Sequence, residues 1–296
     1  MTPKNIEKSQ QFRIHQSRSY YSSLSAYRGM MSDRRRNNFY NSILSQVKGK
    51  TVLDIGAGVG ALSLAAIKAG AKKVYAVEVN PEAVELLKKV RDENQFYNLE
   101  IINASSWDLK LPEKVDFIVH EIFGPFLLDE LCLITLDDVK KHLAPGGKML
   151  PEEFGFIFKP YSLARNSDSV QAICELNKTY KKLNEGQIII EDLVTEDPYV
   201  NSIEFGPFKF DNYPLNKMEN SVKLDAEVLM DSLWVVPYVQ VGSTRLLLCK
   251  QDHSHHWGNT FLAFDSFVDM DKNTTVSLKF YIDESLASFN TSLELY

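Results

Sequence analysis

Two glutamates, Glu121 and Glu130, stand nine residues apart with Gly124-Pro125 between them to reverse the chain. The segment leaves a hydrophobic strand and enters a helix, so a hairpin of this length can aim both carboxylates into one pocket. Two converging anions repel each other and are accommodated only around a cation. A planar guanidinium suits them, because each carboxylate can accept paired hydrogen bonds from it. The alternative is that Glu121 caps the helix and Glu130 lies on its exposed face, and the spacing alone favours neither arrangement.

A second group of candidates is a glycine-rich turn between the expected strand Thr51–Ile55 and the expected helix Ala61–Lys68. Glycines at such a junction let the backbone approach a ligand closely and present free N–H groups at the helix start. Gly56, Gly58 and Gly60 are therefore candidates for binding a cofactor.

The acidic residues around this turn narrow the choice of cofactor. Glu78 ends the next strand, where a carboxylate can accept both hydroxyls of an adenosine ribose. Gly56, Gly58 and Ala61 also fit the dinucleotide pattern of nicotinamide enzymes, with Glu78 about 20 residues on. Asp54 favours a methyl donor, S-adenosylmethionine, because a carboxylate there would repel a pyrophosphate but can face an amino or sulfonium group. A third reading is that the glycines only make a tight turn.

The elements that must position these residues alternate between strand and helix up to Pro151. Strands followed by helices predict a parallel sheet with right-handed crossovers. A helical region with a break near Gly29 precedes this pattern, and a helix over 170–183 with several short β-like runs follows it. The expected strands are 51–55, 74–78, 99–103, 115–120 and 148–150, a turn is expected at 144–147, helices are expected at 61–68, from Asn80 and at 127–143, and the later β-like runs are 233–241, 244–249, 260–264 and 276–282.

Composition excludes several classes of protein. The chain has 296 residues and a formal net charge of −6, from 33 basic and 39 acidic side chains, so generic nucleic-acid binding is not expected. The basic run 34–36 is by default a solvated helix face. The three cysteines are far apart and show no metal-ligand spacing, which argues against a zinc site or a disulfide framework. Residues 1–10 are polar and no stretch has the length of a membrane helix, so a cytoplasmic protein without membrane contact is expected.

Taken together, these motifs resemble the protein arginine methyltransferase family, from about residue 20 to the C-terminus. The family's double-glutamate loop reads S-E-x-M-G-x-x-L-x-x-E, and the chain matches it at Glu121, Gly124, Leu127 and Glu130. Several motifs in the right order are much harder to meet by chance than one. The other matching segments are 52–60, 69–74, 143–147, the His255-His256-Trp257 loop, which is similar to Thr-His-Trp, and Tyr20-Tyr21-Ser22-Ser23-Leu24, which is similar to the Y-F-x-x-Y helix.

The resemblance implies an α/β fold of two domains. Residues 1–150 would hold N-terminal helices and a Rossmann-like, seven-stranded methyltransferase domain that binds S-adenosylmethionine. Residues 151–296 would form a β-barrel-like substrate domain with a helical insert at about 165–186. The resemblance also implies a homodimer, although this insert is shorter than the dimerisation arm of typical members. The implied acceptor is an arginine of a protein or peptide.

The resemblance also implies a role for each matching residue. Glu121 and Glu130 would grip the acceptor guanidinium, His256 would pair with Asp33, and Arg36 would bind the carboxylate of the cofactor. The other implied cofactor-binding residues are Asp54, Gly56, Gly58, Gly60, Glu78 at the ribose, Tyr21 on the N-terminal helix, and Trp107 or the adjacent Asp108 at the adenine.

Several positions depart from the family pattern and keep other functions open. His120 replaces a serine, Ile122-Phe123 replace tryptophan-methionine, Pro125 stands where an aromatic is usual, and Cys132 replaces a methionine. One alternative is a methyltransferase of free arginine or another small amine or guanidine. Another is a methyltransferase-like subunit that binds partners without catalysis. A nicotinamide oxidoreductase is the third.

Overall fold

The computed structural model describes most of the chain from residue 24 onward. Two regions named above, the insert expected at 165–186 and Tyr21, lie outside the described residues. The described residues are 24–128, 130–162, 187–190, 195, 197, 199–252, 255–284, 286 and 289–296.

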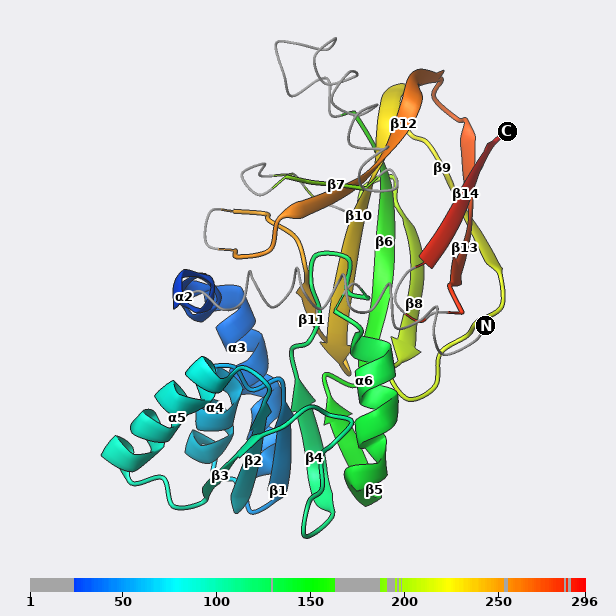
Figure 1. The fold of residues 1–296 in the computed structure, drawn as a ribbon. Helices are drawn as coiled ribbons and strands as arrows, with labels where there is room; N and C mark the ends of the chain where they lie inside the picture. The colour runs from blue at the N-terminus through cyan, green and yellow to red at the C-terminus, as the bar shows by residue number, and fades with distance from the viewer. Residues whose placement is uncertain are drawn as a thin grey trace.

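Five parallel strands form the first sheet, in the order β3-β2-β1-β4-β5 (Figure 1). All five residues of β1 are buried, as expected for a parallel strand covered on both faces. This confirms the Rossmann-like α/β fold, but the described residues give the sheet five strands rather than seven, because the chain leaves it after β5 and pairs antiparallel from β6 onward. The strands are β1 (Thr51–Ile55), β2 (Lys73–Glu78), β3 (Leu99–Asn103), β4 (Val115–His120) and β5 (Leu143–Leu150).

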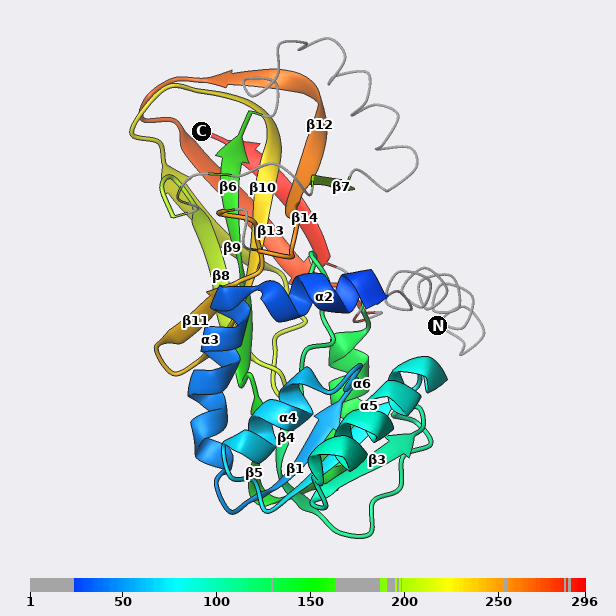
Figure 2. The ribbon, with the colours of Figure 1, turned by 90° about the vertical axis from the view of Figure 1, so that its left-hand side faces the viewer.

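Helices flank this sheet on both faces, with α3, α4 and α5 on one side and α6 on the other (Figures 1 and 2). The N-terminal helical region breaks at Asp33 rather than near Gly29. Asp33 is extended and accepts a hydrogen bond from the backbone N–H of Arg36 at 3.0 Å, so it caps a new helix. None of the described helices has the length and apolar character needed to span a bilayer. The helices are α2 (Leu24–Ser32), α3 (Arg34–Ile43), η1 (Leu44–Val47), α4 (Ala61–Lys68), α5 (Pro81–Asn94), α6 (Cys132–Val139) and η2 (Lys140–His142).

Two predicted boundaries around α6 were wrong. Leu127 and Leu131 have φ angles of 64° and 60°, which a helix does not accommodate, so α6 begins at Cys132 instead of residue 127. The turn predicted at residues 144–147 is part of β5, which runs back to Leu143.

Two antiparallel sheets follow the parallel one and occupy the other half of the molecule (Figure 2). One has the order β7-β12-β10-β6-β8, with β11 paired to β10, and the other has the order β14-β13-β9. The four later β-like runs predicted from the sequence fall largely within β10, β11, β12 and β13. The strands are β6 (Glu153–Tyr161), β7 (Gln187–Ile190), β8 (Ile203–Lys209), β9 (Met218–Lys223), β10 (Val228–Val241), β11 (Thr244–Leu247), β12 (Asn259–Met270), β13 (Thr275–Ile282) and β14 (Phe289–Leu295).

An aromatic core holds the two antiparallel sheets together. The ring of Phe156 on β6 lies 5.2 Å from that of Phe280 on β13 and 5.1 Å from that of Phe289 on β14. Phe158 on β6 contacts the same two rings at 5.7 and 5.8 Å. Because β6 follows directly on β5, this core anchors the second half of the chain beside the parallel sheet. The division into domains at residue 150 stays a prediction.

Candidate active site

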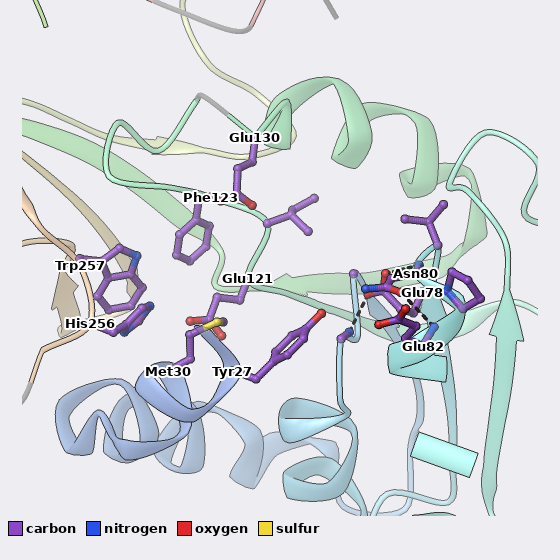
Figure 3. Close-up of a pocket in the computed structure, with 15 residues that line it drawn as sticks. Tyr27, Met30, Glu78, Asn80, Glu82, Glu121, Phe123, Glu130, His256 and Trp257 are labelled. Atoms are coloured by element: carbon purple, nitrogen blue, oxygen red, sulfur yellow. Dashed lines mark hydrogen bonds between the residues drawn. The ribbon is translucent and has the colours of Figure 1, made fainter. Parts of the chain in front are cut away.

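A cavity of about 510 Å³ lies at the carboxyl ends of β1, β2 and β4 and is bordered by α2 (Figure 3). Ligands of open parallel sheets bind at this edge, where loops leave neighbouring strands in opposite directions. The cavity is lined from β1 by Gly56 and Gly58, from β2 by Glu78, from the loop after β4 by Glu121 and Glu130, and from the loop before β12 by His256. The structure therefore brings six of the predicted site residues to one space.

The glycine turn forms a close-fitting cradle. Gly56 and Gly58 have φ angles of 72° and 53°, a region that side chains other than glycine rarely adopt. A Cβ on Gly58 would lie 2.7 Å from the ring of Tyr27, which crosses the turn from α2. The backbone N–H groups of Gly58 and Asn80 each donate to one carboxylate oxygen of Glu78, both at 2.7 Å. Glu78 is thus held in place with lone pairs left for ribose hydroxyls.

The third glycine of the turn, Gly60, is not among the residues that line the two described cavities. A Cβ there would come within 2.3 Å of the Leu87 side chain on α5. Gly60 has a φ of 89° and caps α4, so a glycine here permits the turn and the close approach of Leu87; its predicted contact with the cofactor stays a prediction.

The two glutamates of the loop after β4 both line the cavity, from opposite ends of the turn at residues 124–128. Figure 3 shows the Glu121 side chain beside Met30 and Tyr27, and the Glu130 side chain directed to the same space from above Phe123. The alternative in which Glu121 caps the following helix is wrong, because α6 begins only at Cys132. Two carboxylates around one cavity form a site for a cation.

Glu121 already holds a cation in this structure. The Nε of Arg36 donates to its two oxygens at 2.6 and 2.8 Å, and Nη2 of Arg36 forms an ion pair with Oε2. Both side chains are about 95% buried, and the Arg36 guanidinium also lies 5.3 Å from the ring of Tyr40. Arg36, which was expected to meet the carboxylate of the cofactor, is paired in this structure with one of the two glutamates expected to hold the acceptor.

Arg36 and Asp54 share a second, small cavity of about 40 Å³ behind the first. Asp54 accepts a hydrogen bond from the Ser63 hydroxyl at 2.6 Å. Complete burial raises the pKa of the Asp54 carboxyl to about 7, against the lowering effect of Ser63, and the negative charges of Glu121 and Glu78 raise it further. A positively charged amino group arriving here would favour the ionised form of Asp54.

His256 and Asp33 form the predicted pair. One oxygen of Asp33 accepts from Nδ1 of His256 at 3.0 Å and from its backbone N–H at 3.2 Å, while the other caps α3. Burial acts to raise the pKa of Asp33, but hydrogen bonds from His256 and from the backbone of Arg36 outweigh it and lower the pKa to about 2. Asp33 therefore stays ionised and fixes both the loop and the helix.

The structure does not bring the two residues predicted at the adenine to the cavity, and their contact with the adenine stays a prediction. Trp107 is 54% exposed, and neither it nor Asp108 lines either described cavity. The Asp108 carboxylate accepts from the Ser105 hydroxyl at 2.7 Å and closes the loop after β3. The far end of the cavity is instead bounded by Val79, which is 45% exposed, and by residues 80–82 at the start of α5.

Nine lining residues were not among the predicted site residues, and four of them form the wall opposite the glycine turn: Tyr27, Met30, Phe123 and Trp257. Tyr27 and Met30 lie three residues apart on α2, a spacing that places both on one helix face. Phe123 stacks against Trp257 with ring centroids 6.4 Å apart, and Trp257 contacts His256 at 3.8 Å. The helical spacing was the available signal for the first two, whereas the aromatic wall joins segments more than 100 residues apart.

Comparisons with known proteins agree with this geometry. Residues 39–151 match the family model described as ribosomal protein L11 methyltransferase (PrmA). Protein arginine N-methyltransferase 6 of Danio rerio is 27% identical over 282 residues, which cover 86% of this chain and 81% of that protein. Histone-arginine methyltransferase CARMER of Drosophila persimilis is 34% identical over 168 residues, and the match covers 55% of this chain but 32% of that protein.

A solved structure has the same fold over nearly the whole chain. It is the Trypanosoma brucei PRMT1 enzyme-prozyme heterotetrameric complex with AdoHcy. Its TM-score is 0.77 at 21% sequence identity, and the match covers 93% of this chain and 94% of that one. The likeness therefore includes the antiparallel sheets as well as the parallel one.

Proposed function

Since the chain is a divergent member of the protein arginine methyltransferase family, we propose that it transfers a methyl group from S-adenosylmethionine to an arginine guanidinium of a protein. One observation carries the proposal: Glu121 and Glu130 line the same cavity as Gly56, Gly58 and Glu78. A carboxylate pair suited to a guanidinium thus faces a cradle suited to an adenosine.

The residues around the cradle fit this cofactor. Glu78 would accept the ribose hydroxyls, and the turn has no room for side chains at Gly56 and Gly58, where a Cβ would meet Ile122 and Tyr27. Arg36 and Asp54, side by side in the small cavity, supply a cation for the carboxylate and an anion for the amino group of the methionine end. When bound, S-adenosylmethionine would supply a methyl group attached to a positively charged sulfur. The sulfur keeps the electron pair of the S–C bond when the methyl group is transferred.

The part of the cavity that would hold the acceptor has to make an arginine guanidinium, a poor nucleophile, reactive. An arginine side chain is charged near neutral pH, so its nitrogens have little free electron density. Glu121 and Glu130 would fix the guanidinium with one nitrogen facing the methyl group and draw positive charge toward the nitrogens that they hold. Forming the new N–C bond releases one proton, which Glu130 or the ring of His256 can accept. Asp33 stabilises a protonated His256 and stays ionised itself.

Labelled S-adenosylmethionine tests the proposal. The protein is incubated with an arginine-containing histone-like peptide, its lysine counterpart, free arginine and a metabolite extract, and mass analysis identifies what takes up the label. Label in the arginine peptide alone is expected. Label only in free arginine or a metabolite would move the assignment to a small-molecule methyltransferase. Binding of S-adenosylhomocysteine without any transfer would indicate a non-catalytic subunit, and binding of NAD instead would indicate an oxidoreductase.

Variants link the activity to the loop after β4. Glu121→Gln and Glu130→Gln should each lower the transfer rate by about 10²-fold or more, because a misplaced acceptor loses the benefit of proximity. Glu93→Gln, at an exposed position of α5, is the matched control and should react at the wild-type rate. Full turnover in both cavity variants would refute the role of the glutamates.

We also propose a cytoplasmic homodimer as the working form. The Trypanosoma brucei protein of similar fold belongs to a heterotetrameric complex, which supports association of this chain as well. Size-exclusion chromatography with light scattering tests the assembly, and a mass of one chain, 33.7 kDa, would refute it.

A further inference from the structure

The ion pair between Arg36 and Glu121 sets two assigned roles against each other. Both carboxylate oxygens of Glu121 accept hydrogen bonds from Arg36, and these use the edge of the guanidinium formed by Nε and Nη2. Nη1 donates to the side chain of Asn37 at 2.9 Å. In this arrangement Glu121 cannot also grip an acceptor guanidinium through paired bonds, and Arg36 cannot offer that edge to a second carboxylate.

The small cavity that Arg36 and Asp54 line is also too small for the methionine end of the cofactor. Its 40 Å³ has room for a few water molecules but not for the carboxylate and amino groups of an amino acid. Its walls include Arg36, Asp54, Glu121 and Met30, so a cofactor whose methionine end contacts both Arg36 and Asp54 can be accommodated only if one of these side chains moves.

We propose that Arg36 exchanges partners, releasing Glu121 when it takes the carboxylate of the cofactor, so that the acceptor site is completed only after the cofactor binds. The half of this inference that concerns the acceptor rests on the proposed function. Arg36 is then a positioning residue for the acceptor as well as a ligand of the cofactor. The protein binds its two reactants in a fixed order.

Charge and anchoring make such an exchange feasible. A buried cation is costly to leave unpaired, and Arg36 faces a carboxylate both before and after the exchange. Its backbone stays fixed because Asp33 caps α3 through the Arg36 N–H at 3.0 Å, so only the side chain has to move. Glu121 is the group left without a cation, and a guanidinium acceptor supplies the one that it lost.

The affinity for S-adenosylhomocysteine tests the exchange without any methyl transfer. In Glu121→Gln the carboxylate that competes for Arg36 is gone, so S-adenosylhomocysteine should bind about 10-fold more tightly than to wild type in isothermal titration calorimetry. Glu130→Gln is the matched control, since the side-chain hydrogen bonds of Arg36 go to Glu121 and Asn37, and it should leave this affinity unchanged. Equal or weaker binding to Glu121→Gln than to wild type would overturn the exchange.

A measurement on the wild-type protein covers the case in which Glu121→Gln does not fold. A fluorescein-labelled peptide with one arginine among glycines is titrated with the protein, with and without saturating S-adenosylhomocysteine, and its lysine counterpart is the control. The arginine peptide should bind about 10-fold more tightly, or better, when S-adenosylhomocysteine is present. By linkage, S-adenosylhomocysteine should bind more tightly to the same degree when the peptide is present. Equal peptide affinity in both conditions would overturn the proposed order.

The two experiments separate failure of the inference from failure of the proposed function. A peptide that binds in neither condition counts against an arginine acceptor, and the calorimetry of Glu121→Gln then decides the exchange by itself. Transfer to arginine with unchanged affinities would instead keep the proposed function and remove the exchange.

Discussion

The substitution Asp33→Asn should destabilise the protein by about 2 kcal/mol at pH 7. Asp33 is fully buried, and its carboxylate accepts hydrogen bonds from the backbone N–H of Arg36 and from two groups of His256. These bonds lower its pKa from 3.8 to about 2, and a tenfold change in an acid dissociation constant corresponds to about 1.4 kcal/mol. An asparagine can still cap α3 through its one oxygen, but its amide nitrogen would face the N–H groups of His256.

The effect should depend on pH in a direction fixed by the lowered pKa of Asp33. The folded protein holds the carboxylate ionised at a lower pH than the unfolded chain does. The stabilisation is therefore complete above about pH 5 and is lost as the pH falls toward 2.

Urea unfolding of both proteins at pH 7, and at steps from pH 5 down to 3, measures the difference. Asp92→Asn is the control, because Asp92 is an exposed residue of α5 paired only with its neighbour Arg91, and it should not change the unfolding midpoint. Equal stability of wild type and Asp33→Asn at pH 7 would refute the reasoning. A difference that persists unchanged at pH 3 would refute the part that concerns ionisation.

Three further predictions concern the cofactor end of the site. Gly60→Ala should lower stability by about 1–3 kcal/mol through its contact with Leu87 while leaving the affinity for S-adenosylhomocysteine unchanged, as thermal unfolding and calorimetry can show. Burial of Asp54 raises its pKa to about 7, so wild-type stability should fall as the pH rises from about 4 to 7, because the unfolded chain releases the proton that the folded protein retains. This slope should be smaller in Asp54→Asn, and equal slopes in urea unfolding would contradict the assignment. Glu78→Gln should weaken S-adenosylhomocysteine binding about 10-fold or more, whereas Trp107→Ala should not, and the reverse ranking would restore the predicted adenine contact.

Periodicity and turn residues were enough to predict most of the parallel sheet. β1 reads as a continuous buried run, and proline after Asn80 marks the start of α5, where Asn80 caps the helix. The start of α6 was missed because Leu127 and Leu131 look helical by composition, yet both adopt positive φ in the loop that carries the glutamates. Contacts of that loop with the rest of the fold therefore outweighed the helical preference of its leucines.

Pairings between distant side chains could not be predicted. Arg36 and Glu121 are 85 residues apart, and each has a plausible partner in the reactants, so residue type alone does not reveal that they meet. Gly58 and Gly60 are likewise equivalent as sequence letters. Only the neighbours Tyr27 and Leu87 show that one borders the cavity and the other permits helix packing.

The residues around the loop after β4 that depart from the family pattern alter the packing beneath the loop, whereas both of its carboxylates are present. His120 is fully buried between the rings of Phe123 and Phe210, with centroid distances of 6.0 and 4.7 Å, and its Nε2 lies 3.2 Å from the Pro151 carbonyl oxygen. Burial lowers the pKa of this histidine to about 3, so it is neutral at physiological pH and adds no charge beside Glu121.

The Tyr40 hydroxyl donates to the His120 carbonyl at 2.9 Å, and the same helix α3 carries Arg36 and is capped by Asp33. One short helix therefore fixes the base of the acceptor loop, the cation that occupies Glu121 and the loop of His256. An acceptor that needs Glu121 has to act through that helix.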